Sequence, residues 1–535
     1  MAVTQPVFAA LDNFHPDAVL ATGPDALNEP ALAVDEIQGN ILPGFGTSAM
    51  LLLGLKIESG GAGPQSARRW LRQLAPRVTT LNQMQQLREV RRAVARARGA
   101  KLALPDVLLN VALAFPALAL LGLATDGIDD PPFRNGMAGT SLQDPLDENG
   151  VPLNWVVGAT PETTPDVLLI LGSDEPAALR RAHQLIRSSL GKTAKQGLRL
   201  FYQEYGETLP GETEHFGFRD GISQPGVRGR LSARPDHALT RRYFSPDDFR
   251  AETFARPGQP LIWPGQFLFG YPTQLNDEPA EPGPEAEPPE PWMRDGSMLV
   301  FRRLRQDVAA FRAFATEQAV AVSEQLNRAV TAAEIQAWLV GRWPDGTPLT
   351  RSPQAPDQAE AGDVMRVNFF AYQEEEPDAI LVDDGRRFTT PGVAGDDAGL
   401  RCPHFAHVRK VNLRDKTTDQ GASLRFRILR RGIPYGPAYV ENEATTPDRG
   451  LLFLSYQRSI DPQFITLSAT WMNQADAPEG FGHDLLVGQN LAGRAAQRPD
   501  FEGEDVQLTA GQTTWVTPTG GGFFFSPAIS VLAGL

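Results

Sequence analysis

Apolar and polar positions along the first part of the chain follow a pattern that predicts four strands and two helices. The strands are expected at residues 50–57, 107–114, 167–171 and 198–205, and the helices at residues 67–78 and 175–190. Ser173 and Asp174 come just before the second helix and are good capping residues for it. The resulting order, βαββαβ, is typical of a ferredoxin-like unit.

A similar order begins again near residue 297. Strands are expected at residues 297–303, 451–456 and 522–526, with helices at residues 307–325 and 461–472. We therefore predict an α+β protein of two ferredoxin-like halves, whose antiparallel sheets pack together as a dimeric α+β barrel-like pair. Helices would cover one face of each sheet, and the interior between the two free faces would suit a large flat ligand.

Breaks in the pattern suggest where these halves begin and end. Residues 1–35 are mixed in character and are expected to form an N-terminal arm. The first half would span residues 36–275, and the second would span residues 296–535 with an insertion at about 330–400. Between them, residues 276–295 are rich in Pro and Glu without an apolar period, which predicts a solvated linker or surface loop.

Charge and hydropathy exclude several classes of partner. The 535 residues include 50 basic and 64 acidic ones, a net charge of −14, which argues against a nucleic-acid-binding surface. The longest apolar candidate, residues 107–123, carries Asn110 and Pro116 and is shorter than the about 20 residues of a membrane span. The N-terminus has neither a signal-peptide pattern nor a twin arginine, so a cytoplasmic location is expected.

Metal ligands are few. The single cysteine, Cys402, excludes an internal disulfide and cysteine-rich zinc or iron–sulfur sites. Seven histidines remain, and two of them, His404 and His407, lie three residues apart in the stretch 401–415. On a helix the pair could share a zinc ion, or either could serve packing alone. Alternatively, one could bind the metal of an anionic cofactor whose charge is neutralised by the nearby Arg409, Lys410 and Arg414.

Two further stretches crowd polar groups into apolar surroundings. In residues 214–226, glycines bracket Asp220, which permits either an ordinary turn or the close approach of a ligand. In residues 425–436, Arg430 and Arg431 come at the end of an apolar run that predicts a strand. They would face opposite ways, so that one points inward or both remain in solvent.

Taken together, these stretches resemble the dye-decolourising peroxidases, which are haem enzymes, and most of all the larger, later-branching members of that family. The resemblance runs from about Asp35 to the C-terminus. Its motifs are EIQGNIL at 36–42, FGFRDGISQP at 216–225, PGQFLFGYP at 264–272, GSMLVFR at 296–302, CP at 402–403 with AHVR at 406–409, RRGIPYG at 430–436, GLLF at 450–453 and TPTGGG at 517–522.

The resemblance implies a role for each matching residue. His407 would be the axial ligand of the iron of haem b, with Asp220 as acid–base group and Arg430 as charge stabiliser on the opposite face. The haem-binding set would also include Gly221, Ile222, Ser223, Gln224, Arg409 and Arg414, the last as a propionate partner. The family usually has Asn-Pro-Arg where this chain has Asn412-Leu413-Arg414. Asp461 is a candidate partner for the second ring nitrogen of His407.

The implied activity is a hydrogen-peroxide-dependent oxidation of dyes, phenols or other organic reductants through a ferryl intermediate, by a monomer or homo-oligomer. A protein that stores haem or removes its iron without peroxidase turnover is the alternative, and the joint presence of Asp220 and Arg430 favours the enzyme. Bulky reductants cannot reach a buried haem, and no single one of the eight Trp and eight Tyr residues stands out as an electron relay.

Overall fold

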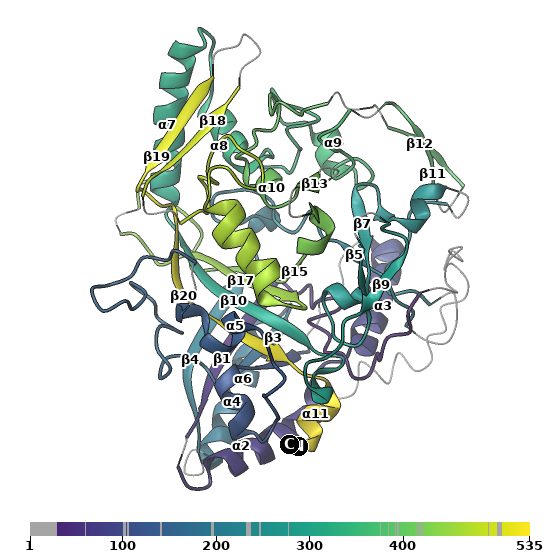
Figure 1. The fold of residues 1–535 in the computed structure, drawn as a ribbon, viewed down its shortest axis with the longest axis vertical. Helices are drawn as coiled ribbons and strands as arrows, with labels where there is room; N and C mark the ends of the chain where they lie inside the picture. The colour runs from purple at the N-terminus through teal and green to yellow at the C-terminus, as the bar shows by residue number, and fades with distance from the viewer. Residues whose placement is uncertain are drawn as a thin grey trace.

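The computed structural model describes most of the chain and centres on one antiparallel sheet (Figure 1). The described residues are 29–535 except for 59, 100–102, 104, 105, 140, 141, 194–196, 232–236, 246, 247, 276, 277, 375, 383, 384, 391, 393, 394, 415, 416, 419, 420, 444, 490, 491 and 500–504. Residues 1–28 of the expected arm therefore lie outside the described residues. Within the described part, no helix is both long and apolar enough to cross a membrane.

The first half of the sheet follows the ferredoxin-like prediction. Its strands stand in the order β2-β3-β1-β4. They are β1 (Ala49–Ile57), β2 (Leu108–Leu113), β3 (Val167–Ser173) and β4 (Leu198–Glu207), so the four predicted strands are confirmed within a few residues. The two predicted helices are confirmed as α2 (Gly63–Leu74) with the turn η1 (Ala75–Arg77), and as α6 (Pro176–Thr193).

One long helix of the first half, α3 (Leu81–Arg98), was not predicted. Thr80 begins it with a capping box, in which the Thr80 hydroxyl accepts from the Gln83 N–H and the Gln83 side chain accepts from the Thr80 N–H. Short helical elements complete this half; they are α4 (Phe115–Leu120), α5 (Pro131–Asn135), η2 (Met137–Gly139) and η4 (Pro210–Glu212).

The second half repeats the topology. Its strands stand in the order β16-β17-β10-β20, and they are β10 (Ser297–Gln306), β16 (Ile433–Tyr435), β17 (Gly450–Gln457) and β20 (Val516–Ser526). The predicted strands correspond to β10, β17 and β20, while β16 supplies the fourth. The predicted helices are α7 (Val308–Gln325) and η9 (Ile460–Met472), the latter with π-type hydrogen bonds. The short strand β15 (Leu429–Arg430) adds to β17.

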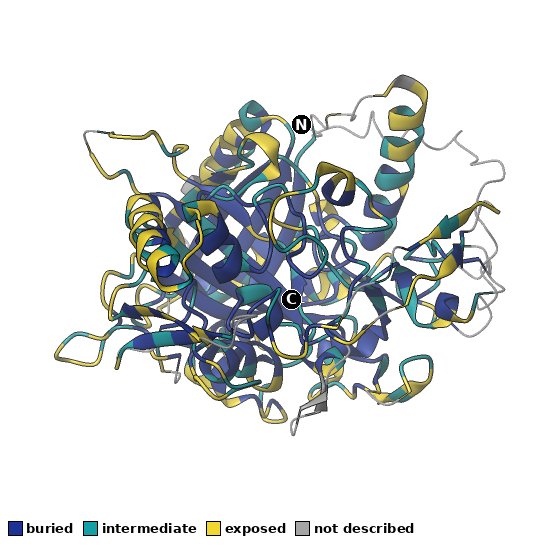
Figure 2. Ribbon diagram, turned by 90° about the horizontal axis from the view of Figure 1, so that it is seen from above, coloured by how far each residue is buried: buried dark blue, intermediate teal, exposed yellow. Residues whose placement is uncertain are grey.

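The two halves close into a single barrel. β10 pairs with both β20 and β17, while β2 pairs with β20 and β4 pairs with β16. Because side chains alternate along a strand, each strand contributes to both faces of the wall. On β10, Leu299 and Phe301 belong to an interior core of apolar side chains that includes Tyr456 and Phe524. Figure 2 shows the strands at the centre of the molecule coloured as buried.

The barrel interior is therefore a filled core, and the prediction that a flat ligand lies between two opposed sheets is wrong. Closing the sheet brings the two inner faces near enough for their side chains to interdigitate. A ligand must instead bind outside the barrel, on the opposite face of the wall strands.

The outer layer consists of shorter elements. Pro282–Glu285 of the acidic segment forms strand β9, which pairs with β8 (Pro272–Gln274). The segment predicted as an insertion contains α8 (Ala332–Val340), α9 (Gln358–Gly362), β11 (Ala379–Leu381) and β12 (Arg387–Thr389). The other elements are β5 (Gly226–Val227), η5 (Phe249–Glu252), β6 (Phe254–Arg256), β7 (Gln259–Ile262), η6 (Pro264–Gln266), η7 (Pro291–Met293), α10 (His407–Lys410), β13 (Thr417–Thr418), β14 (Gly421–Ala422), η8 (Ser423–Phe426), β18 (Arg494–Arg498), β19 (Val506–Gly511) and α11 (Ile529–Gly534).

Candidate active site

A cavity lies on the outer face of β10, β17 and β20, beneath η9. The strands contribute side chains that alternate with the barrel core, among them Leu304 and Phe453, and η9 contributes Phe464, Ser468 and Met472. The loop at 214–223, α10 and β15 bring His407, Asp220 and Arg430 to the same cavity. The three residues to which the sequence assigned the central roles are thus brought together, in a mainly apolar space.

His407 is held by a buried carboxylate. Its Nδ1 lies 2.7 Å from Oδ2 of Asp484, which is fully buried. The other Asp484 oxygen accepts from the backbone N–H groups of Leu486 and Val487, both at 3.0 Å. With Nδ1 donating to a carboxylate, Nε2 of the imidazole carries the free lone pair that a metal ion requires.

The sequence placed a different residue beside His407. Asp461 is exposed at the start of η9, where its carbonyl accepts from the Thr466 hydroxyl, and the carboxylate that reaches His407 belongs to Asp484. The prediction that Asp461 is the partner of His407 is therefore wrong. The string Asp484-Leu485-Leu486-Val487 did carry a usable signal, because an Asp before an apolar run commonly caps the next backbone N–H groups.

Close packing of two short helices positions His407. Helix α8 ends at Gly341, whose φ of +95° is in the left-handed region, and a Cβ there would lie 2.3 Å from Cγ2 of Val408 on α10. Val408 lines the cavity beside His407. Glycine at this position therefore permits the approach that fixes the start of α10.

Arg409 supports α10 from outside the cavity. Its guanidinium is fully buried, pairs with Asp396 at 3.1 Å and Glu479 at 3.2 Å, and lies 4.2 Å from the ring centroid of Tyr372. It does not line the cavity among the described residues. Arg409, which the sequence predicted to bind the cofactor, thus anchors α10, the helix that carries His407.

Asp220 and Arg430 form an ion pair across the cavity from separate halves of the chain. Nη1 of Arg430 lies 2.9 Å from Oδ1 of Asp220, and their side chains are 35% and 40% exposed. Burial opposes ionisation of the Asp220 carboxyl, but the charge of Arg430 and hydrogen bonds from the Gly221 N–H and Arg430 outweigh it, so its pKa lies below the usual value. The carboxyl is therefore ionised and available as a proton acceptor.

The loop around Asp220 is tied directly to Arg430. Nη2 of Arg430 donates to the carbonyl of Ser223 at 3.1 Å. The Gln224 side chain donates to the carbonyl of Arg430 and accepts from its N–H, at 3.1 and 3.3 Å. Gly221, Ile222 and Ser223 line the cavity, whereas Gln224 acts on the backbone of Arg430. Together they hold the ion pair in one orientation.

Glu214 is a cavity residue to which the sequence assigned no role. Its carboxylate accepts from the backbone N–H groups of Phe216 and Phe218, both at 2.9 Å, and from the side chain of Gln306 at 2.5 Å. Burial raises the pKa of Glu214 to about 7, even though these hydrogen bonds oppose the shift. Through its hydrogen bonds to Phe216 and Phe218, Glu214 fixes the loop that leads to Asp220.

Positive charge collects around the cavity without full compensation. Arg342, to which the sequence assigned no role, lines the cavity and donates to the carbonyls of Gly346 and Val367 and to Asn368, but pairs with no carboxylate among the described residues. Burial lowers its pKa to about 9, and the charges of Arg414 and Arg430 contribute to the shift. An anionic ligand would relieve this repulsion.

Arg414, the expected propionate partner, does not line the cavity among the described residues. Its Nη1 donates to the carbonyls of Asn368 and Phe370, both at 3.0 Å, and its guanidinium lies 3.5 Å from the ring centroid of Phe370. Arg414 itself has a φ of +55°, in the left-handed region of backbone conformation.

Comparisons with known proteins match two long segments of the chain to one family. The family description "DyP dimeric alpha+beta barrel domain" matches residues 36–201, and "Dyp-type peroxidase, C-terminal" matches residues 331–483. The dye-decolorizing peroxidase msp1 of Mycetinis scorodonius is 31% identical over 453 residues, which are 80% of this chain and 76% of that protein.

Two solved structures extend the likeness to three dimensions. An ancestral D-type dye-decolorizing peroxidase shares 29% identity with a TM-score of 0.73, over 94% of this chain and 98% of that one. A dye-decolorizing peroxidase in complex with 2,6-dimethoxyphenol shares 26% identity with a TM-score of 0.68, over 94% and 99% of the two chains.

Proposed function

The chain belongs to the dye-decolourising peroxidase family, and from this premise we propose that its outer cavity binds haem b with His407 as the axial ligand. The chain is a haem peroxidase, an enzyme that consumes hydrogen peroxide and a reductant.

The residues around the cavity fit such a cofactor. The imidazole of His407, whose Nδ1 is hydrogen-bonded to Asp484, is a ligand of the kind that haem iron takes. Leu304, Phe453 and Phe464 supply the apolar surface that a porphyrin needs. Arg342 offers a cation without a described carboxylate partner, which suits the propionates.

When bound, haem would supply the redox chemistry between hydrogen peroxide and the reductant. The chain supplies proton transfer and charge. In the proposed mechanism the ionised Asp220 accepts a proton from one peroxide oxygen and returns it to the departing oxygen. Arg430 cannot give up its proton, so it stabilises negative charge on that departing oxygen and holds Asp220 in place.

Small phenols are a suitable class of reductant for this cavity. The relative bound to 2,6-dimethoxyphenol supports that choice, because its fold covers nearly the whole of both chains. Phenols can give up one electron and one proton at a time, which matches single-electron reduction after reaction with peroxide. Dyes and other bulky organic reductants form the second class that we propose.

The observation that carries the proposal is the Asp220–Arg430 ion pair, which faces the same cavity as His407. A haem-storage protein needs the pocket and the ligand but has no use for an acid–base group and a fixed cation opposite them. The experiment is an absorption spectrum of the purified holoprotein before and after one equivalent of hydrogen peroxide. A shifted Soret band supports peroxidase chemistry, while an unchanged band refutes it.

Two variants sharpen the experiment. Asp220→Asn should retain the resting haem spectrum and slow the peroxide-dependent change by about a hundredfold or more, the usual contribution of a positioned acid–base group. Asp461→Asn is the matched control, because it makes the same chemical change at an exposed carboxyl outside the cavity. Equal rates in the two variants would contradict the role of Asp220. A pyridine haemochrome spectrum would test whether the haem is haem b.

A further inference from the structure

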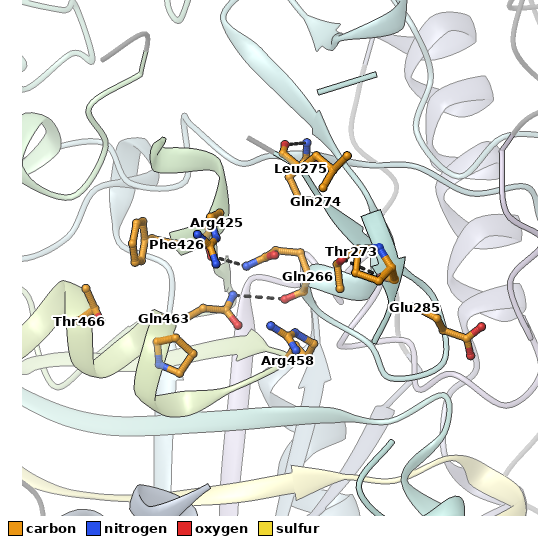
Figure 3. Close-up of a pocket in the computed structure, with 12 residues that line it drawn as sticks. Gln266, Thr273, Gln274, Leu275, Glu285, Arg425, Phe426, Arg458, Gln463 and Thr466 are labelled. Carbon is orange, nitrogen blue, oxygen red and sulfur yellow. Dashed lines mark hydrogen bonds between the residues drawn. The ribbon is translucent and has the colours of Figure 1, made fainter. Parts of the chain in front are cut away.

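A second pocket, with a volume of about 760 Å³, is lined in part by the first turns of η9 (Figure 3). Its walls come from the β8–β9 hairpin, from Gln266, from the segment at Arg425 and Phe426, and from the first turns of η9. The volume falls within the range of about 300–1000 Å³ that is typical of small-molecule sites. The pocket is thus large enough for an aromatic molecule with substituents.

Two arginines give this pocket its charge. Arg425 is exposed at the pocket and Arg458 is half-buried, and neither guanidinium pairs with a carboxylate among the described residues. Nε of Arg458 is buried without a hydrogen-bond partner in the described part of the chain. The carboxylate in the lining, Glu285, is 3.0 Å from Arg294 and is already compensated.

The positive charges of Arg425 and Arg458 repel each other when no anion is bound. Burial lowers the pKa of Arg458, and the charge of Arg425 lowers it further. Cations that repel each other at a concave surface favour binding of a negatively charged group.

Other polar groups of the lining are already engaged. Gln266 donates to the carbonyl of Arg425, and Gln463 donates to the carbonyls of Arg427 and Gln266. The hydroxyls of Thr273 and Thr466 donate to the carbonyls of Pro284 and Asp461. Gln274 donates to the carbonyl of Leu275. Among the described side chains of the lining, the two guanidiniums are therefore the charged donors left for a ligand, and they favour an anionic acceptor.

The rest of the lining is apolar. Phe426, Leu275, Pro284 and Pro462 contribute carbon surface between the engaged amides and hydroxyls. A small inorganic anion would leave this surface uncovered, whereas an aromatic acid would cover it and present its charge to the arginines. The apolar lining and the two arginines together favour a ligand with an aromatic ring that bears a sulfonate or carboxylate.

The position of the pocket relates it to the peroxidase site. Gln463 and Thr466 face the pocket, while Phe464, Ser468 and Met472 of the same helix face the active-site cavity. A helix with its side chains is about 10–12 Å across, so one helix separates the two spaces. A molecule in the second pocket is therefore near the cofactor without entering its cavity.

We propose that this pocket binds anionic aromatic reductants, such as sulfonated phenols and dyes, for oxidation by the enzyme. The inference rests on the proposed function and names a substrate class for it. Each bound phenol loses one electron and its hydroxyl proton. Two such losses balance one hydrogen peroxide, which leaves as two molecules of water, and the two phenols leave as phenoxyl radicals.

The test compares Arg425→Gln, Arg458→Gln and the double variant in the holoenzyme with Arg199→Gln. Arg199 is half-exposed, pairs with Glu58 on the first half of the barrel and undergoes the same loss of charge. We expect the KM for 4-hydroxybenzenesulfonate to rise about tenfold or more in the double variant, since charge-assisted hydrogen bonds are lost. The KM values for peroxide and for 2,6-dimethoxyphenol should stay within about twofold.

A binding measurement makes the result independent of turnover. Calorimetry of resting holoenzyme with naphthalene-2-sulfonate, a redox-inert probe, should show binding that the double variant loses and the Arg425→Lys variant keeps. Equal binding of inorganic phosphate, equal losses in Arg199→Gln, or an unchanged KM in the double variant would each overturn the inference. Failure of the proposed function has a different signature, namely a wild-type haem spectrum that does not respond to peroxide. Unchanged resting spectra in the variants show that they are folded.

Discussion

Replacing Arg430 with glutamine removes the cation that lies 2.9 Å from the Asp220 carboxylate. The attraction favours the ionised form of Asp220, so its loss should raise the pKa of that carboxyl. Because both side chains are more than a third exposed, we use the dielectric constant of water, for which unit charges at this distance attract by about 1.4 kcal/mol. That energy corresponds to about a tenfold loss in the preference of Asp220 for its ionised form.

The assay is the pH dependence of kcat/KM for hydrogen peroxide, whose acid limb reports the ionisation of the proton acceptor in the free enzyme. Arg430→Gln should move this limb about one unit toward higher pH and lower the plateau by about a hundredfold, because stabilisation of the departing oxygen is also lost. Arg430→Lys retains the charge and should leave the limb nearer its original position. If the limb stays in place in Arg430→Gln, or moves equally in both variants, Asp220 is not the group whose charge Arg430 controls.

Three further variants test the rest of the site. Asp484→Asn should weaken haem affinity about 10–100-fold and raise the haem reduction potential, because a neutral partner makes the His407 imidazole a poorer donor; a spectroelectrochemical titration measures this. Arg342→Leu should speed haem transfer to apomyoglobin about tenfold, as the propionates lose a cation, and an unchanged rate would contradict that role. The pKa of Glu214 rises from 4.5 to about 7 on folding, so stability should fall as pH rises between these values, by at most about 3 kcal/mol. Denaturant unfolding of Glu214→Gln across that range should show a flatter pH dependence than the wild type.

The strands were predictable where burial on one or both faces leaves a continuous or alternating apolar run. β1 and β3 are buried along nearly their whole length, which is the condition under which hydrophobic pattern and structure agree. The helix α3 escaped prediction because its sequence, LNQMQQLREVRRAVARAR, is mostly polar and its start depends on the Thr80–Gln83 capping box. β16 is three residues long and owes its strand conformation to pairing with β17 and β4, which no local pattern expresses.

Motifs located the residues of the site better than they located their partners. His407, Asp220 and Arg430 each stand in a short string whose order is distinctive, and the structure brings them to one cavity. The partner of His407 lies 77 positions away at Asp484, and its choice over Asp461 depends on how the segment after η9 returns to α10. Contacts between residues so far apart in the sequence are set by tertiary packing. The spacing of residues along the chain gives no information about that packing.

Closure of the barrel explains why the active site needs both halves. The inner face of each sheet is buried in the interior core, so the site lies on the outer wall of the barrel. Helix η9 covers that wall over β10 and β17. The second half provides His407 and Arg430 there, but no described carboxylate from its own strands pairs with Arg430. Asp220 arrives on the loop that leaves β4, and β4 is fixed against β16 at Gly206 and Tyr435, just after the strand end that carries Arg430. The strand pairing that closes the barrel thus also sets the distance between Asp220 and Arg430, so the arrangement of these two residues depends on both halves of the chain.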